Sequence, residues 1–546
     1  ALSQDRVAVS ALIRKQKAAG DVDSWLPGYQ TELSEVKKRR LQELTAKEVK
    51  QHGVERRAVG LRMILEQKKD GRRKGRLIVQ GFKEPLYLDG GPVDAPVAAL
   101  ATIRTLLFMA GLSTDVVSSI DVSTAFLQAD EYGDDAPVRY VYYQPHRHAP
   151  KQYYRLKGAL YGQRSASLEW HKTLSKWLVD SQGFEQGLND ACVYVHPKTG
   201  LKLAIVVDDV LCRGSSKATA SFYEAMAKRF EVKSPTYLTA EKPITYVGLG
   251  VSIEEYAGKR YITVDQGQDL RRYLDALDLP HTGMVSNPMS NKWVPDMQSP
   301  PLSVERAQWY RAVIGSLNFY ACATRYDISF AVSRLAQFSA KPTEDAEKAV
   351  LRVLAYLKSH VDFCLSGSYA TDVDTVEVYS DSDHAGSREV NCRSQSGSMV
   401  ILNKVPVYWR SKKQPSTSIS SACAEIYALS ETVKEARLFQ WRGEELGMKP
   451  LSPLSVQVDN AQAISFSKGT CVNSRLRGTF DIRADWVREL RNRFQLAVVP
   501  VSSSNNCADL CTKAHPTQRF QQLLKLISGT TTSKMIQERA MLAMLV

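Results

Sequence analysis

An apolar run ends in two adjacent aspartates in the stretch Leu203-Ala204-Ile205-Val206-Val207-Asp208-Asp209-Val210-Leu211. Carboxylates at the end of a buried strand are unfavourable unless something neutralises them. A divalent metal ion is the usual partner, and phosphoryl transfer is the chemistry that most often requires one. Taken alone, the pair is more simply explained as the cap of a hairpin turn.

A third aspartate has a similar context, in Val116-Val117-Ser118-Ser119-Ile120-Asp121-Val122. A strand that ends in one aspartate, followed downstream by a strand that ends in two, is the arrangement of a polymerase palm. The rest of the chain therefore decides between a hairpin cap and a polymerase site.

Size and charge favour a large protein with a polyanionic partner. The chain has 546 residues, enough for three or four domains, and a formal net charge of +14. Basic residues are concentrated early, at 37–40 and 68–76, where a solvated face and a phosphate path are both reasonable interpretations. The nine cysteines show no metal-like or disulfide-like spacing, which indicates a reducing, intracellular setting. We find no apolar stretch long enough to cross a bilayer.

The pattern changes after about residue 372. Strands are expected at 376–382, 396–402 and 405–412, followed by a long helix at 422–446, a strand at 454–458, a helix at 481–494 and a strand at 496–502. This is the order of an RNase H fold.

Four carboxylates fall at the ends of these expected elements. They are Asp381, Glu425, Asp459 and Asp509. Such a cluster would bind two metal ions and position a water molecule in line with a phosphodiester. Any one of them is more often a surface acid or a cap, but all four at the positions of one fold favour a metal site.

At these residues the chain resembles the reverse transcriptase and RNase H part of a copia-type (Ty1/copia) LTR retrotransposon Pol polyprotein, over about residues 30 to 515. The blocks that carry the resemblance follow one another in the family's order. They are 74–82, 120–127, 156–162, 206–209, 314–317, 324–328, 409–414, 420–425, 458–460 and 508–513.

The resemblance implies an α+β polymerase right hand of fingers, palm and thumb, followed by an α/β RNase H-like domain with a mixed five-stranded sheet. We expect an N-terminal charged helical extension, fingers and palm, thumb or connection helices, the RNase H-like domain and a C-terminal tail. The corresponding ranges are 1–55, 56–265, 266–370, 371–515 and 516–546.

The resemblance also implies roles for individual residues. Asp121, Asp208 and Asp209 would hold the polymerase Mg²⁺ ions, two per active site, with Mn²⁺ as an alternative. Because successive side chains of a strand point to opposite faces, we expect Asp208 to be the main ligand opposite Asp121. The acids of the second unit would hold a second pair of ions.

Substrate contacts are implied in the same way. Lys74 and Arg76 would contact the incoming triphosphate, the arginine through a bidentate fork. Phe126 would exclude a 2′-hydroxyl, the alternative being an ordinary core phenylalanine. Tyr246 and Gly248 belong to a hairpin that resembles the one gripping the primer terminus.

Several positions depart from the family pattern. Ser165, Val206, Thr479 and Asp485 stand where relatives usually have glutamine, tyrosine and two histidines, respectively. They motivate a second hypothesis, a degenerate or domesticated copy that only binds nucleic acid. A third, an RNA-synthesising palm enzyme, is disfavoured by Phe126 and by the attached RNase H-like unit.

The family's partners complete the expectation. They are an RNA template, a DNA or tRNA primer, the RNA–DNA hybrid and dNTPs, with no membrane partner and with the oligomeric state open. Because the chain starts at Ala1 and has no integrase or protease signature, we expect those parts of the polyprotein to lie outside this fragment. The implied location is cytoplasmic, within virus-like particles, with a nuclear stage during integration.

Overall fold

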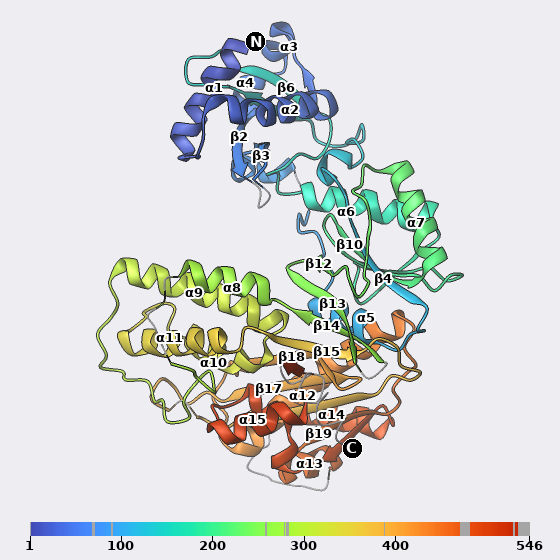
Figure 1. The fold of residues 1–546 in the computed structure, drawn as a ribbon, viewed down its shortest axis with the longest axis vertical. Helices are drawn as coiled ribbons and strands as arrows, with labels where there is room; N and C mark the ends of the chain where they lie inside the picture. Colours follow the sequence, from blue (N-terminus) through green and yellow to red (C-terminus); the bar gives the residue numbers. More distant parts are fainter. Residues whose placement is uncertain are drawn as a thin grey trace.

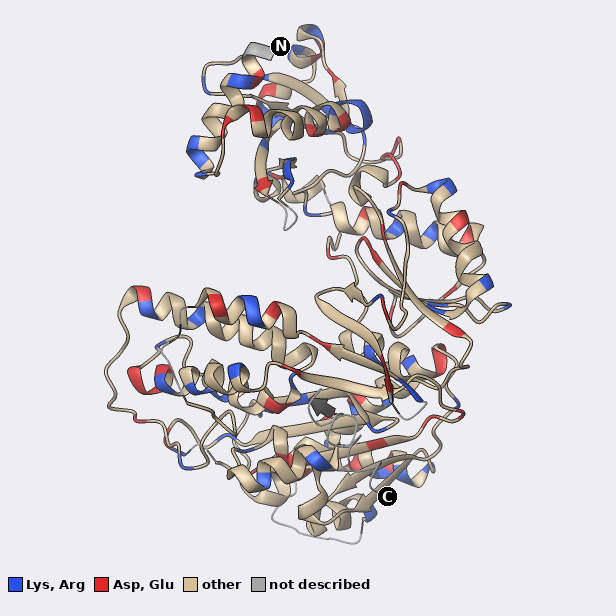
Figure 2. Cartoon of the chain, viewed as in Figure 1, with Lys and Arg blue, Asp and Glu red and all other residues tan. Residues whose placement is uncertain are grey.

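The computed structural model describes most of the chain, namely residues 2–67, 71–88, 91–256, 259–277, 279, 283–386, 388–469, 481–527 and 530–532. The ribbon follows an open curve, with the N-terminal helices at one end and the C-terminal unit at the other (Figure 1). Lysine and arginine occur along the whole ribbon with acidic residues between them (Figure 2), so the positive charge is not confined to the early basic runs.

Among the described residues the strands form four sheets. The first has five strands in the order β1 (Leu41–Glu43), β6 (Gln152–Leu156), β5 (Arg139–Tyr143), β2 (Val59–Gln67) and β3 (Arg73–Val79). In β2, Val59, Leu61, Met63 and Leu65 are buried at a spacing of two, which gives the strand one core face.

Two helices of the N-terminal segment, α1 (Leu2–Gln16) and α2 (Val22–Arg40), pack on that core face. The other two are the short α3 (Ala46–Gln51) and α4 (Val54–Arg57). Trp25 and Tyr29 of α2 share one hydrophobic core with Met63 and Leu77 of the sheet. The helices α1 and α2 of the charged segment 1–55 are therefore packed into the same core as the first sheet.

The second sheet carries the adjacent aspartates. Its six antiparallel strands run in the order β11 (Thr236–Tyr237), β4 (Asp115–Asp121), β10 (Asp209–Ser215), β9 (Lys202–Val206), β8 (Val193–Val195) and β7 (Glu185–Gln186). The helices of this unit are α5 (Leu100–Phe108), α6 (Ala166–Lys176), extended by a π-helical turn at Trp177–Ser181, and α7 (Ser216–Arg229).

The third sheet joins segments from both sides of a helical region. Its strands are β12 (Ile244–Tyr246), β13 (Leu249–Tyr256), β14 (Lys259–Asp265), β15 (Phe363–Ser368) and β21 (Thr530–Thr532). The helices between β14 and β15 are α8 (Gly267–Ala276), α9 (Val304–Ala323), α10 (Ser329–Ala336) and α11 (Glu344–Ser359). Residues 266–365 are mostly helical, as predicted, but the chain then returns to the sheet as β15.

The fourth sheet is the mixed five-stranded sheet that the sequence predicts. Its order is β18 (Val405–Lys413), β17 (Gln395–Leu402), β16 (Val376–Asp383), β19 (Leu454–Val458) and β20 (Leu496–Pro500). The first three strands are antiparallel, whereas β19 runs parallel to β16 and β20 parallel to β19. Its helices are α12 (Ser421–Glu445), α13 (Ala461–Lys468), α14 (Asp481–Asn492) and α15 (Thr517–Leu526).

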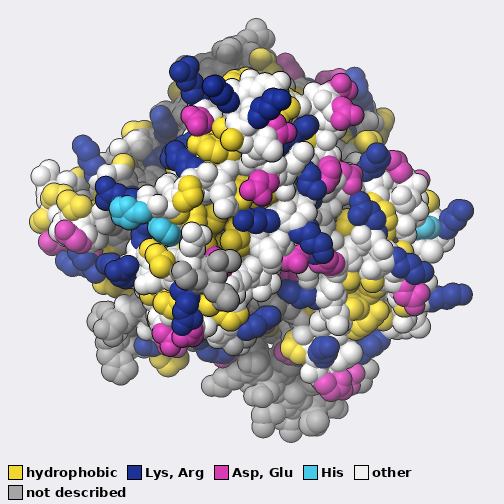
Figure 3. All heavy atoms as spheres, turned by 90° about the horizontal axis from the view of Figure 1, so that it is seen from above, with side chains coloured by type: hydrophobic (Ala, Val, Ile, Leu, Met, Phe, Trp, Pro, Cys, Tyr) yellow, Lys and Arg dark blue, Asp and Glu magenta, His cyan; other side chains and the backbone are white. Residues whose placement is uncertain are grey.

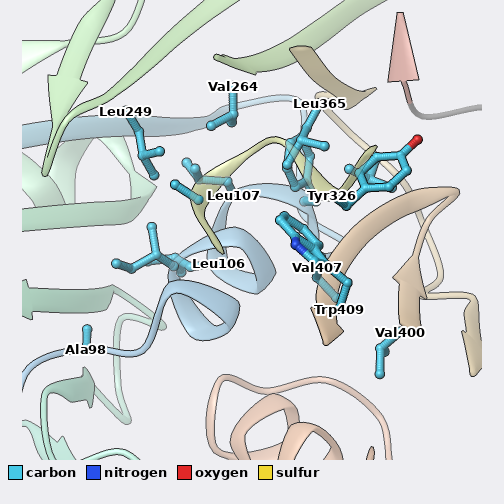
Figure 4. Close-up of a cluster of buried hydrophobic side chains, with 14 of the residues drawn as sticks. Ala98, Leu106, Leu107, Leu249, Val264, Tyr326, Leu365, Val400, Val407 and Trp409 are labelled. Atoms are coloured by element: carbon cyan, nitrogen blue, oxygen red, sulfur yellow. The ribbon is translucent and has the colours of Figure 1, made fainter. Parts of the chain in front are cut away.

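One hydrophobic core runs through the second, third and fourth sheets. Figure 4 shows Leu106 and Leu107 of α5 near Leu249 and Val264 of the third sheet, with Trp409 of β18 also in the cluster. Phe520 of α15 is buried and lies edge-on to Tyr356 of α11 at 5.9 Å between ring centroids, so residues just after 515 also join this core. No described helix is long and apolar enough to cross a membrane.

Candidate active sites

The three aspartates of the first candidate site meet at the edge of the second sheet. Asp121 ends β4, Asp208 lies in the turn between β9 and β10, and Asp209 begins β10 directly opposite Asp121. The backbone N–H of Val122 donates to the carbonyl oxygen of Asp208 at 2.9 Å, which holds the turn against the end of β4. The pair is thus both a hairpin turn and part of an acidic cluster.

The turn that presents Asp208 has an unusual backbone. Val207 has φ +56°, a region that a β-branched side chain rarely adopts. The first residue of such a two-residue hairpin turn is normally glycine. Two buried side chains hold the hairpin: Trp170 donates from Nε1 to the Val207 carbonyl at 2.7 Å, and Tyr246 donates from its hydroxyl to the Ala204 carbonyl at 2.8 Å. Strain that is held by surrounding contacts is typical of functional sites.

The acids open onto a pocket of about 650 Å³ between the first and second sheets. Of the three aspartates, Asp121 and Asp208 line it and Asp209 does not. Besides these acids, the lining holds cations and two half-buried aromatic rings from distant parts of the chain: Arg72, Arg73, Lys74, Arg76, Phe126, Tyr161 and Lys233.

The electrostatics of this site favour a bound cation. Burial raises the pKa of Asp208, and burial with repulsion from Asp208 and Asp121 raises the pKa of Asp209 to about 6. Oxygen-only donors of this kind suit Mg²⁺. Asp121 is paired with Lys233, whose Nζ lies 2.8 Å from Oδ2.

Lys233 is a residue of the candidate site that the sequence did not reveal. It follows α7, and its backbone N–H donates to the Asp121 carbonyl at 2.9 Å. Nothing in its local sequence marks it, because the contact exists only once the segment after α7 lies beside β4.

The expected triphosphate contacts share the pocket with the aspartates. The guanidinium of Arg76 lies 5.2 Å from the centroid of the Tyr161 ring. The ring of Phe126 lies 5.2 Å from the same ring, at an interplanar angle of 51°. Tyr161 thus supports both side chains, and Lys74 lines the pocket beside them.

The two residues of the expected primer contact, Tyr246 and Gly248, lie in different environments. Tyr246 is only 1% exposed and its hydroxyl is bound to the Ala204 carbonyl, so its side chain supports the aspartate hairpin from behind. The primer contact expected of Tyr246 stays a prediction, and the buried ring would act on a primer only through the hairpin that it supports. Gly248 is exposed in the turn between β12 and β13 with φ +82°, and a Cβ there would lie 3.1 Å from Cζ of Phe319.

The second candidate site lies in the C-terminal unit. Asp381 of β16, Glu425 of α12 and Asp459, just after β19, each place one ligand oxygen within 4.8 Å of the others. Oxygen Oε2 of Glu425 is buried and has no hydrogen-bond partner. A buried carboxylate oxygen without a donor is unfavourable, and a bound cation would satisfy it.

Burial and mutual repulsion shape the charge of this triad. Burial, and then repulsion by Asp381 and Asp459, raise the pKa of Glu425 well above its ordinary value. Burial also raises the pKa of Asp381, although Lys513 opposes the shift. Without a cation, such a site favours protonated carboxyls.

Asp509 does not join the triad in the way that the sequence suggested. Lys513 Nζ lies 2.6 Å from its Oδ1, and an Arg519 nitrogen lies 3.1 Å from its Oδ2. Burial acts to raise the pKa of Asp509, but these cations outweigh it and lower the pKa. The structure thus brings three of the four expected acids together, and the role of Asp509 as a metal ligand stays a prediction; Thr512 donates a hydrogen bond to Asp381 beside them.

The positions that depart from the family pattern have ordinary environments where the structure describes them. Ser165 is buried just before α6, and Val206 is half-buried opposite Asp209. Asp485 forms an ion pair with Arg488 at 2.5 Å. Thr479 lies outside the described residues.

Comparison with known proteins shows what the chain is similar to. Residues 46–291 match the family described as Reverse transcriptase (RNA-dependent DNA polymerase). The chain is 28% identical over 491 residues to the Retrovirus-related Pol polyprotein from transposon TNT 1-94 of Nicotiana tabacum, and 30% identical over 493 residues to that from transposon RE2 of Arabidopsis thaliana. The resemblance to the copia-type Pol polyproteins is confirmed.

These copia-type relatives are much longer than the chain. The matches cover 86% of this chain but 36% and 32% of the two plant proteins. A truncated transposon Ty1-A Gag-Pol polyprotein of Saccharomyces cerevisiae is 24% identical, again over 86% of this chain and 39% of its own length. The chain thus spans about a third of the length of the curated relatives that it matches.

A solved structure shares the fold over most of the chain. It is a foamy viral protease-reverse transcriptase (dRH) in complex with double-stranded DNA, with a TM-score of 0.52 and 11% sequence identity. The match covers 88% of this chain and 70% of that one. At this identity, the likeness concerns the fold alone.

Proposed function

We propose that the chain is an RNA-directed DNA polymerase of a copia-type retrotransposon that also cleaves RNA in RNA–DNA hybrids. The observation that carries the proposal is the single pocket that brings Asp121 and Asp208 together with Lys74 and Arg76. Carboxylates for metal ions and cations for phosphates are what template-directed nucleotidyl transfer requires. In this proposal the first sheet belongs to the fingers, the second to the palm, and α8–α11 to the thumb or connection.

The residues of the polymerase pocket have separate roles in this proposal. Asp121, Asp208 and Asp209 would hold two Mg²⁺ ions, or Mn²⁺, whose chemistry is to polarise the primer 3′-hydroxyl and to neutralise the phosphates. Release of Lys233 from Asp121 would free that carboxylate and leave a cation for the triphosphate. Arg76, fixed by Tyr161, orients the nucleotide with Lys74, and Phe126 lies where it can reject a 2′-hydroxyl.

The second activity rests on the triad of Asp381, Glu425 and Asp459. These side chains would hold the ions of an RNase H site and direct a water molecule at the RNA phosphodiester. Asp509, neutralised by Lys513 and Arg519, would lie beside the triad and present those cations to the nucleic acid backbone. We propose that the partners are an RNA template, a DNA or tRNA primer and dNTPs, in cytoplasmic particles that also contain the integrase and protease of the polyprotein.

The test is magnesium-dependent extension of a DNA primer on an RNA template, with product and template fragments read on one gel. Changing Asp208 to Asn should abolish extension and leave hybrid binding nearly intact, because the carboxylate is needed for chemistry and not for duplex affinity. The exposed Asp135, changed to Asn, is the matched control and should extend as the wild type does. Extension by D208N at a rate similar to wild type would contradict the site assignment.

The same gel, together with a binding measurement, distinguishes the polymerase from the second hypothesis, a copy that only binds nucleic acid. Tight binding of the hybrid with no magnesium-dependent synthesis by the wild-type chain would indicate a nucleic-acid-binding copy without polymerase activity. Competition between deoxynucleotides and ribonucleotides tests the RNA-synthesising alternative.

A further inference from the structure

The first sheet has two faces, and one of them leads out of the polymerase pocket. On β5 and β6, Val141, Tyr143 and Tyr154 belong to the core beneath α1 and α2. Because side chains alternate along a strand, their neighbours on these strands lie on the opposite face of the sheet. We call this set the tyrosine face, and its members are Tyr140, Tyr142, Tyr153 and Arg155.

The tyrosine face combines half-buried rings with cations. Tyr142 pairs in register with Tyr153, and their ring centroids lie 6.1 Å apart. Lys151 Nζ lies 4.5 Å from the centroid of the Tyr142 ring, and the guanidinium of Arg57 lies 5.1 Å from that of Tyr140. These contacts hold the cations beside the rings, where they can meet phosphates while bases stack.

This face is continuous with the polymerase pocket. On β2 and β3, Ile64 lies opposite Arg76, which itself lines the pocket, and the exposed Arg62 follows on the same face. One strand further, Gly60 pairs with Tyr142. The glycine leaves room there, since a Cβ would lie 3.1 Å from the Tyr142 hydroxyl. Neighbouring strands are about 4.8 Å apart, and Ile64 lies four residues along β2 from Gly60, so the path from Arg76 to Tyr153 spans roughly 20 Å.

The path ends in a hollow of about 780 Å³ at the edge of the sheet. Tyr153 and Lys151 line it together with Lys50 and Arg56, and the acids Glu43 and Glu55 lie among them. Figure 3 looks down on this end of the molecule and shows lysine and arginine side chains among hydrophobic ones, with acidic side chains scattered between them. A surface of alternating rings and cations has the chemistry that single-stranded nucleic acid recognises.

We propose that the tyrosine face binds the unpaired template strand ahead of the polymerase pocket, an inference that rests on the proposed function. Bases of the single strand stack on Tyr142, Tyr153 and Tyr140, and Arg62, Lys151 and Arg155 neutralise its phosphates. The strand is recognised without sequence preference, because every base has a stacking face.

The experiment compares two primer–template hybrids that differ only in the length of the single-stranded template overhang. Affinity is measured by fluorescence anisotropy for the wild type and for the variant Y142L/Y153L/K151E. Wild type should bind the long overhang more tightly than the short one, and the variant should lose that difference, with the long-overhang affinity reduced about 10-fold or more. RNA and DNA templates form two arms that show which strand is preferred.

The matched control is Lys15→Glu. Lys15 is exposed on α1, which packs on the core side of the same sheet, so this variant has the same change in charge in the same unit. K15E should retain the overhang effect. Binding of a free single-stranded RNA is measured alongside, since it does not depend on polymerase activity, and circular dichroism checks that the variants fold.

Two results would overturn the inference. One is equal affinity of wild type for the two hybrids while primer extension proceeds, which leaves the polymerase function intact. The other is single-strand binding by the folded triple variant that equals that of wild type. If the wild type neither extended the primer nor bound the hybrid, the proposed polymerase function itself would be contradicted.

Discussion

At the scale of single residues, both candidate sites hold carboxylates where burial makes their charge unfavourable. The clearest case is Glu425, which is 6% exposed and has a buried oxygen without a hydrogen-bond donor. A buried carboxylate oxygen without a donor lowers the free energy of unfolding, and this cost is typical of a site that binds a cation. The same reasoning applies to Asp209, whose pKa is raised to about 6.

Changing Glu425 to Gln should stabilise the metal-free protein while it abolishes hybrid cleavage. Burial and the repulsion from Asp381 raise the pKa of Glu425, so the folded protein keeps a proton that the unfolded chain has lost. The free-energy cost of keeping this proton in the folded state is absent below the unfolded pKa of about 4.5 and grows as the pH rises above it. The gain, about 1–3 kcal/mol in the free energy of unfolding, should therefore be larger at about pH 8 than at about pH 5.

Thermal unfolding in the presence of a chelator measures this gain, and the exposed Glu389, changed to Gln, is the control. Added Mg²⁺ should stabilise the wild type more than E425Q, because binding to the folded state alone raises stability. Equal responses of the two proteins to Mg²⁺ would show that Glu425 is not a ligand.

At the scale of elements, the hairpin of β9 and β10 is held in a backbone that its own sequence disfavours. Val207 has a positive φ, and the bond from Trp170 fixes its carbonyl while the bond from Tyr246 fixes β9 just before the turn. The chain therefore uses packing behind the hairpin to hold Asp208 in the pocket. A turn of favourable sequence would not need this support.

Changing Val207 to Gly should leave stability unchanged or raise it by up to about 1 kcal/mol, because glycine accepts positive φ without strain. The rate of primer extension should nevertheless fall several-fold, since a looser turn positions Asp208 less well. Changing the neighbouring Val206 to Gly is the control. That residue lies in β9, so its replacement should lower the free energy of unfolding by about 1 kcal/mol or more. If V207G destabilised the protein as much as V206G, the turn would not be strained.

At the scale of the whole molecule, the C-terminal unit is fixed to the second-sheet unit by polar contacts, some of them buried. Arg104 of α5 is 3% exposed, stacks on Trp409 and donates to the carbonyls of Val407, Cys322 and Ala323. Glu445, at the end of α12, accepts hydrogen bonds from the backbone N–H groups of Leu188 and Asn189 and from the Asn189 side chain. Both candidate sites thus belong to units that share one core and these bonds.

Changing Glu445 to Ala should weaken this docking by about 1–3 kcal/mol, because three donors lose a charged acceptor. Urea-induced unfolding should show a lower midpoint, and limited proteolysis should cut faster near residues 187–190. Glu444 is the control, since its side chain accepts a hydrogen bond from Gln440 within α12 itself. Equal midpoints for E445A and E444A would mean that the contact with Asn189 does not hold the units together.

Much of the architecture follows from local patterns in the chain. The alternation of apolar residues predicted the strands of the mixed sheet, and the two aspartates after an apolar run predicted a strand end that meets Asp121. These features can be read from the sequence because a strand's two faces and a helix's stripe impose short, regular spacings. Asp381, Glu425 and Asp459 were found for the same reason, since each lies at or near the end of such an element.

Other features exist only because distant segments meet. The pairing of Lys233 with Asp121, the neutralisation of Asp509 by Lys513 and Arg519, and the burial of Tyr246 behind the hairpin all depend on tertiary contacts. The same is true of α1 and α2, whose charged sequence gave no sign that they would share a core with the first sheet. Local spacing carries information about which face of an element is buried, but not about which partner covers it, and that partner sets the charge and the accessibility of each site.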